Sequence, residues 1–163
     1  MRFLLVLAAM LVLAGCASSP PRFDTSDIRD GLTPRKVADG ADVFEGDSVL
    51  WGGTLVSVEN REGSTLLQVL SYPLGSGQRP DTDQAAGDRF LVEYPGFLDP
   101  ADYAPGRAVT VKGRVTGSRE GQVGESHYRF AVLHGSDIEL WPKQTDRARS
   151  NPSVNFGFGI ILN

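Results

Sequence analysis

Apolar and polar residues alternate in several short stretches between residues 49 and 141, and this pattern predicts β-strands. In the clearest stretch, 108–116, valine or glycine occupies every second position and Thr, Lys or Arg lies between. A period of two places one face of a strand in a core and the other in water. Similar stretches predict strands at 49–58, 65–72, 89–94, 128–133 and 136–141, the last two joined by a turn at His134 and Gly135.

Six short strands around one core predict an all-β fold. A closed or partly closed barrel is favoured, because closing the sheet removes its exposed edges. The pattern Val-x-Val-x-Gly-x-Val from Val109 to Val115 is similar to the strongly coiled strand of an OB-type barrel. We therefore predict a small six-stranded, OB-like closed or partly closed barrel. Thr33 supplies an N-cap, Pro34 a first helical residue and Gly40 a stop, so one short N-terminal helix is expected over 34–39.

The two ends of the chain differ from this central part. An apolar run over 3–13, preceded by Arg2 and followed by small residues, is typical of a secretory signal peptide over 1–15. It is too short for a membrane span, which needs about 20 apolar residues. We expect a polar spacer at 16–33, the barrel domain at 34–141, and a linker with an alternating apolar tail at 142–163, so both ends are expected to be flexible.

Two segments are left open by their composition. The loop 73–87 contains Pro73, Pro80 and three glycines, and loops of this length are typically functional or mobile. The tail alternates from Val154 to Leu162, so it could pack as an extra strand, meet a partner or touch lipid.

Cys16 is the only cysteine of the 163 residues, and it ends the motif Leu13-Ala14-Gly15-Cys16 directly after the apolar run. This motif is similar to the bacterial lipobox, whose cysteine receives a diacylglycerol and, after cleavage, an N-acyl chain. The alternative is a free or buried thiol in a secreted protein. No intramolecular disulfide is possible with one cysteine. Ala17 is not the aspartate that marks retention in the inner membrane, which favours an outer-membrane anchor facing the periplasm.

Composition disfavours several function classes. Removal of residues 1–15 takes away only Arg2, which leaves 15 basic and 20 acidic side chains, a poor composition for nucleic-acid binding. His127 and His134 are the only histidines, so neither a metal site nor a Ser-His-Asp arrangement is indicated. We expect no metal, no cofactor beyond the acyl groups on Cys16, and no enzymatic activity.

Several motifs resemble the Slp family of starvation-inducible outer-membrane lipoproteins. After Cys16 the resemblance covers most of residues 40–141, and its most specific elements are Trp51-Gly52-Gly53 and Gly96-Phe97-Leu98-Asp99-Pro100. The resemblance implies lipidation, an outer-membrane location and a link to starvation or stress, and it brings no known reaction.

Two functions follow as hypotheses. The first is a non-catalytic envelope module, with membrane lipid and an envelope protein or saccharide as partners. The second is a carrier of a small ligand or saccharide that uses the barrel face near Trp51 and the loop 73–87. Trp51 is either a core ring over bare glycine backbone or a stacking platform, and Asp99 and Arg107 are expected to pair. The candidate ligand-binding residues are Trp51, Arg79, Phe97, Asp99 and Arg107.

Overall fold

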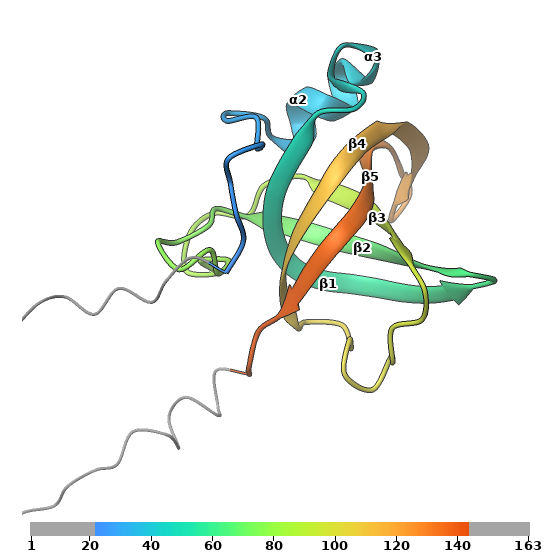
Figure 1. Ribbon diagram of the computed structural model, residues 1–163. Coiled ribbons are helices and arrows are strands. Elements are labelled where there is room, and N and C mark those ends of the chain that lie inside the picture. The colour runs from blue at the N-terminus through green and yellow to red at the C-terminus, as the bar shows by residue number, and fades with distance from the viewer. Residues whose placement is uncertain (1–21, 144–163) are drawn as a thin grey trace, which may run out of the picture.

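Five strands form one closed barrel in the computed structural model, which describes residues 22–143 (Figure 1). The strands are β1 (Ser48–Arg61), β2 (Ser64–Tyr72), β3 (Arg89–Pro95), β4 (Ala108–Val123) and β5 (Ser126–Leu140). They neighbour one another in the order β1-β2-β3-β5-β4, and β4 closes the ring on β1. All pairs are antiparallel except β3 with β5. A five-stranded barrel of this kind is OB-like, which confirms the predicted fold class.

The number of strands differs from the predicted six, because the expected hairpin at 128–141 is one continuous strand. His134 and Gly135 lie inside β5, and Gly135 is paired with Gly113 of β4. The register shifts by one residue on β5 beside this pair. Such a bulge accepts glycine within a strand. A side chain at Gly135 would meet Val92 Cγ1 at 2.9 Å, so the glycine permits close packing and does not mark a turn.

The turn that joins β4 and β5 lies further out, at Gly124, whose φ is +61°. Strand β4 therefore extends past the predicted end at residue 116 to Val123. A second register shift lies between Val115 and Gly117, and Gly117 has a φ of +139°. The outer part of β4 lies largely in water, and its sequence is polar and contains glycine. It therefore lacks the alternation that predicts a strand.

The core fills the barrel with residues from every strand. Its fully buried members include Val49, Leu67, Phe90, Val111 and Leu133, each with an exposed fraction of 0%. Helix α2 (Pro34–Asp39) adds Val37 and Ala38 to the same cluster. Leu98, from the loop between β3 and β4, adds another buried side chain. Helix and loop lie at opposite ends of the barrel (Figure 1).

Helix α2 begins and ends at the predicted residues. The Thr33 side chain accepts a hydrogen bond from the Lys36 amide, Pro34 follows it, and the Gly40 amide donates to the Val37 carbonyl. A second short helix, α3 (Ala41–Phe44), follows directly, so residues 22–143 contain two helices where one was expected. Gly40 therefore separates two helices.

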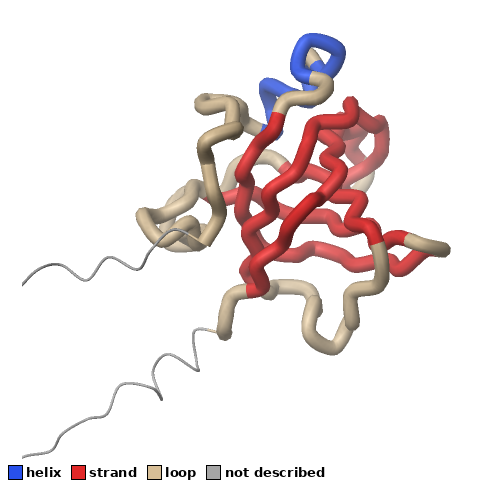
Figure 2. The backbone as a smooth tube through the Cα atoms, viewed as in Figure 1, coloured by secondary structure: helices blue, strands red, loops and turns tan. Residues whose placement is uncertain are grey.

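Residues 22–33 lie against the barrel, although residues 16–33 were expected to form a polar spacer. Phe23 is 5% exposed, and Ile28 forms a bridge with Ser48 at the start of β1. This N-terminal segment runs beside the loop between β2 and β3 (Figure 2). Residues 16–21 and the tail 154–162 lie outside the described residues. The spacer at 16–21 and the role of the tail therefore stay predictions.

Candidate functional site

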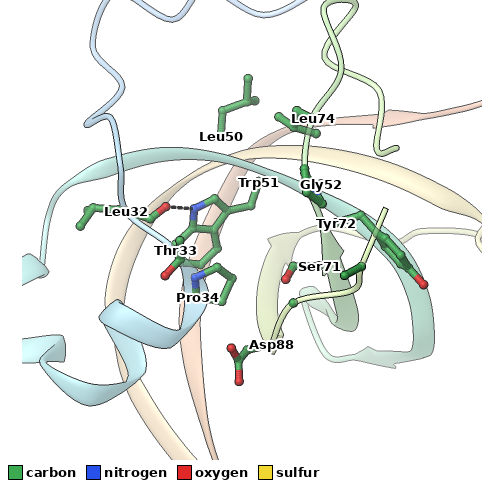
Figure 3. Close-up of a pocket in the computed structure, with 13 residues that line it drawn as sticks. Leu32, Thr33, Pro34, Leu50, Trp51, Gly52, Ser71, Tyr72, Leu74 and Asp88 are labelled. Carbon is green, nitrogen blue, oxygen red and sulfur yellow. Dashed lines mark hydrogen bonds between the residues drawn. The ribbon is translucent and has the colours of Figure 1, made fainter. Parts of the chain in front are cut away.

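A pocket of about 520 Å³ opens beside Trp51, between the N-terminal segment, the first half of β1 and the loop that follows β2 (Figure 3). We call it the Trp51 pocket. Thirteen residues line it: Leu32, Thr33, Pro34, Leu50, Trp51, Gly52, Ser71, Tyr72, Pro73, Leu74, Ala85, Gly87 and Asp88. Most are apolar, as in typical small-molecule sites of 300–1,000 Å³.

Trp51 forms the inner wall of this pocket. The indole is 7% exposed and packs edge-on against Phe90, with ring centroids 5.2 Å apart. Its Nε1 donates a 3.0 Å hydrogen bond to the Leu32 carbonyl, which fixes the ring against the N-terminal segment (Figure 3). The ring is therefore part of the core and a wall of the pocket at once.

Gly52 and Gly53, which follow Trp51, leave space for neighbours other than the indole ring. A Cβ on Gly52 would collide with Leu74 and lie 2.8 Å from Pro80 Cγ, and one on Gly53 would collide with the Leu70 carbonyl oxygen. Bare backbone lets the loop 73–87 and β2 approach β1 closely. Gly52 thus lets Leu74 reach the pocket, and Gly53 lets β2 pack close to β1.

One buried amide joins the loop 73–87 to the N-terminal segment. Gln78 accepts a 2.8 Å hydrogen bond from the Phe23 amide through Oε1 and donates a 3.0 Å bond to the Phe23 carbonyl through Nε2. The Gln78 carbonyl accepts a 2.6 Å bond from the Thr110 hydroxyl, which in turn accepts from Trp141 Nε1. These hydrogen bonds connect the N-terminal segment and the loop 73–87, which form two walls of the pocket, to Thr110 of β4.

Asp88 is the one carboxylate among the thirteen residues that line the pocket. Its Oδ1 accepts a 3.0 Å hydrogen bond from the Tyr128 hydroxyl and lies 3.7 Å from Arg35 of helix α2. The Tyr128 oxygen also accepts from the Arg89 amide. Burial, with a smaller contribution from the Asp88 carboxylate, raises the pKa of Tyr128 above its ordinary value of 10.0.

A second, smaller pocket of about 200 Å³ contains two other predicted site residues, Arg79 and Arg107, beside Trp141. Arg79 donates to the Pro142 carbonyl and lies 5.5 Å from the centre of the Trp141 ring. Arg107 donates to the carbonyls of Asp102 and Trp141. Both guanidinium groups therefore hold the chain where it leaves β5.

The expected pair between Asp99 and Arg107 is wrong. The Asp99 carboxylate accepts a 2.9 Å hydrogen bond from the Ala101 amide, a local turn of the kind that aspartate favours. Arg107 is already engaged by two carbonyls. Phe97 is 71% exposed and does not line either pocket. The structure thus brings together only Arg79 and Arg107 of the five candidates.

Sequence reasoning pointed to Trp51 and the loop 73–87, which includes Leu74, and it missed the N-terminal side of the pocket at Leu32, Thr33 and Pro34. Leu32 lies in a segment without periodicity, and tertiary contacts bring it to Trp51. Cys16 lies outside the described residues, so its lipidation stays a prediction. Within residues 22–143, no helix is long and apolar enough to cross a membrane. The same part of the chain holds no group of three or more His, Cys, Asp or Glu side chains suited to a metal ion.

Known proteins resemble this chain in sequence. It is 32% identical over 131 residues to the uncharacterised lipoprotein YeaY of Escherichia coli (strain K12). The aligned region covers 80% of this chain and 67% of that protein. It is 29% identical over 140 residues to the outer membrane protein Slp of the same organism, over 84% and 73% of the two chains. A solved structure of the mitochondrial single-stranded DNA-binding protein Rim1 of S. cerevisiae aligns with a TM-score of 0.38 at 16% identity, over 59% and 95%.

The family comparison covers most of the chain. The outer membrane lipoprotein Slp family matches residues 13–158, which include the motif that ends at Cys16, the whole barrel and most of the tail. The chain belongs to the outer membrane lipoprotein Slp family.

Proposed function

We propose that this protein is a non-catalytic module of the cell envelope, held on the outer membrane by acyl chains on Cys16 and facing the periplasm. The single observation that carries the proposal is the family match, which begins at residue 13 and so includes Leu13-Ala14-Gly15-Cys16. One acyl chain gives only marginal membrane binding, whereas two or three hold a protein durably. The barrel then supports or binds envelope components under starvation or stress.

The fold supports a tethered module. Phe23, seven residues after Cys16, is buried and hydrogen-bonded to Gln78. An extended chain spans at most about 3.6 Å per residue, so Cys16 lies within roughly 25 Å of Phe23. The barrel is therefore kept within a short distance of the lipid surface.

Substitution of Cys16 tests the anchor. Cys16→Ala is expected to leave an unprocessed precursor that incorporates no labelled palmitate in growing cells, because the acylated sulfur is gone. A matched control is the double variant Cys16→Ala, Ser18→Cys, which keeps a thiol outside the motif and is also expected to remain unlabelled. Palmitate incorporation and normal processing in Cys16→Ala would contradict the proposed anchor.

Protease access tests the orientation. In intact cells the barrel is expected to resist added protease, and it should become cleavable once the outer membrane is opened. Cleavage in intact cells would instead indicate a surface-facing protein.

The stress link predicts a rise in the amount of the protein when growing cells are moved to starvation, measured by immunoblot.

A second candidate function, a small-ligand carrier, is supported by the Trp51 pocket and by the loop residues Pro73, Leu74, Ala85 and Gly87 that line it. A saccharide presents many hydroxyl groups, and each one buried without a partner costs free energy. The mostly apolar lining therefore disfavours a saccharide.

A further inference from the structure

We propose that the Trp51 pocket binds the acyl chain of a lipid. The inference rests on the proposed anchor at Cys16, because the anchor determines which apolar molecules the pocket meets. It assigns a ligand class to a pocket formed by the N-terminal segment, β1 and the loop 73–87.

The lining of the pocket suits an unbranched hydrocarbon chain. Leu32, Leu50 and Leu74 are partly exposed, and they line the pocket with the indole of Trp51 and the rings of Pro34 and Pro73. Each methylene group that is buried against an apolar lining contributes to binding. A pocket of about 520 Å³ has room for several such groups.

Three of the polar groups that line the pocket are already engaged by the protein. Trp51 Nε1 donates to the Leu32 carbonyl, the Thr33 hydroxyl oxygen accepts from the Lys36 amide, and Asp88 accepts from the Tyr128 hydroxyl. A ligand rich in donors and acceptors would have to find its partners among the remaining groups, such as the hydroxyls of Ser71 and Tyr72. An acyl chain needs none, so the lining favours it over a sugar or a nucleotide.

The position of the pocket brings it near such chains. Gln78 holds Phe23 to the loop 73–87, and Leu74 of that loop lines the pocket. Cys16 lies only seven residues before Phe23. Membrane lipids, and the acyl chains on Cys16 itself, are therefore the apolar molecules most concentrated around the pocket. The shared chemistry is one aliphatic acyl chain from either source.

Fluorescence quenching tests the proposal. All described core contacts lie within residues 22–143, so a chain that begins at Ala17 keeps the fold and lacks the anchor. Within that chain, the variant Trp141→Phe leaves Trp51 as the one tryptophan. The probe is a monoacyl phosphatidylcholine brominated on its chain, used below its micelle concentration, because bromine quenches indole on contact. Trp51 emission should fall with saturation as the probe is added, and glycerophosphocholine without an acyl chain should leave it unchanged.

Three variants provide the controls. Trp51→Phe keeps only Trp141, which lines the second pocket, and its emission should not respond to the probe. Leu74→Asp should weaken binding about tenfold or more, because a charge enters an apolar wall. The matched control Val43→Asp makes the same change at a side chain that is 73% exposed and does not line the pocket, so binding should be retained. If Leu74→Asp does not fold, Ala85→Phe at the exposed rim replaces it and should obstruct the pocket.

The outcomes separate the sources and the two proposals. Equal binding by the chain from Ala17 and by the lipidated full chain in nanodiscs supports a membrane lipid. Binding by the chain from Ala17 alone supports the acyl chain of Cys16 as the occupant. No saturable quenching of Trp51, or equal quenching in Leu74→Asp and Val43→Asp, overturns the pocket assignment. The quenching measured with the chain from Ala17 does not depend on whether Cys16 takes up palmitate, so failure of the pocket and failure of the anchor are distinguished.

Discussion

Single residues without side chains determine how closely the strands of this barrel approach one another. Gly53 is paired with Ser71 on β2 and Val109 on β4. A Cβ there would collide with the Leu70 carbonyl oxygen and lie 2.7 Å from Val69 Cγ1. Backbone atoms do not move aside as a flexible side chain does, so Gly53 is required by the packing of its neighbours.

Gly53→Ala is expected to lower the free energy of unfolding by about 3 kcal/mol, because overpacking of a tightly packed region forces backbone shifts. Chemical denaturation followed by tryptophan fluorescence measures this change. Gly75→Ala is the matched control: its Cβ would come no closer than 3.6 Å to the Arg79 carbonyl oxygen, and its stability should stay within about 1 kcal/mol of the parent. Equal stabilities of the two variants would refute the role given to Gly53.

At the scale of elements, the N-terminal segment belongs to the barrel domain. Besides the Gln78 contacts with Phe23, the Arg29 amide donates to the Ser48 carbonyl at 2.9 Å. Lys112 of β4 lies 2.7 Å from Asp27, and hydrogen bonding from Lys112 is the main cause that lowers the pKa of Asp27. Contacts from two strands and one loop therefore hold this segment in place.

Gln78→Gly should loosen the segment without unfolding the barrel. Gln78 has a φ of +60°, which glycine accepts without strain, so the substitution removes only the side-chain amide. Loss of two hydrogen bonds, each worth about 1 kcal/mol, should speed hydrogen exchange of the Arg29 amide by roughly 30-fold. Native-state exchange measured by NMR detects this.

The control for the segment is Gln84→Gly. Gln84 lies in the same loop, and its side chain donates to Asp81 and not to the N-terminal segment. Its substitution should leave the exchange rate of the Arg29 amide at the parental value. A similar acceleration in both variants would mean that the loop as a whole, and not the Gln78 amide, holds the segment.

At the scale of the whole molecule, two tyrosines link stability to alkaline pH. Burial raises the pKa of Tyr103, and burial also raises that of Tyr128, in each case above 10.0. The folded state therefore favours the neutral phenols, while the unfolded chain ionises at the ordinary value. Stability is complete below pH 10 and is lost as the pH rises from about 10 through the raised folded values.

Thermal unfolding followed between pH 8 and about 11 tests this linkage. The midpoint should fall above pH 10, and the fall should be shallower in Tyr128→Phe, which has no phenol at residue 128 to ionise. Phe97→Leu is the matched control, since Phe97 is 71% exposed and carries no ionisable group, and its alkaline slope should equal that of the parent. Identical slopes in the parent and in Tyr128→Phe would contradict the prediction.

The barrel was predictable from the sequence because its strands alternate, and the helix at 34–39 because Thr33, Pro34 and Gly40 mark its ends. The single strand β5 was not, since Gly135 resembles a turn residue until Val92 and Gly113 are seen beside it. The site was predictable only in part. Trp51 stands out as an aromatic residue before two glycines, and the loop 73–87 stands out by its length, whereas Leu32 reaches the pocket through tertiary contacts that no local pattern records.

The ends of the described chain leave the barrel at one corner. Arg22 pairs with Glu139 at 2.8 Å, and its guanidinium lies 5.1 Å from the centre of the Trp141 ring. Trp141 lies two residues before Lys143, the last described residue. A pull on an anchor ahead of Arg22, opposed by a load attached after Lys143, would therefore be transmitted across a few contacts at this corner. These contacts would bear the tension before the hydrogen-bond ladders of the barrel do.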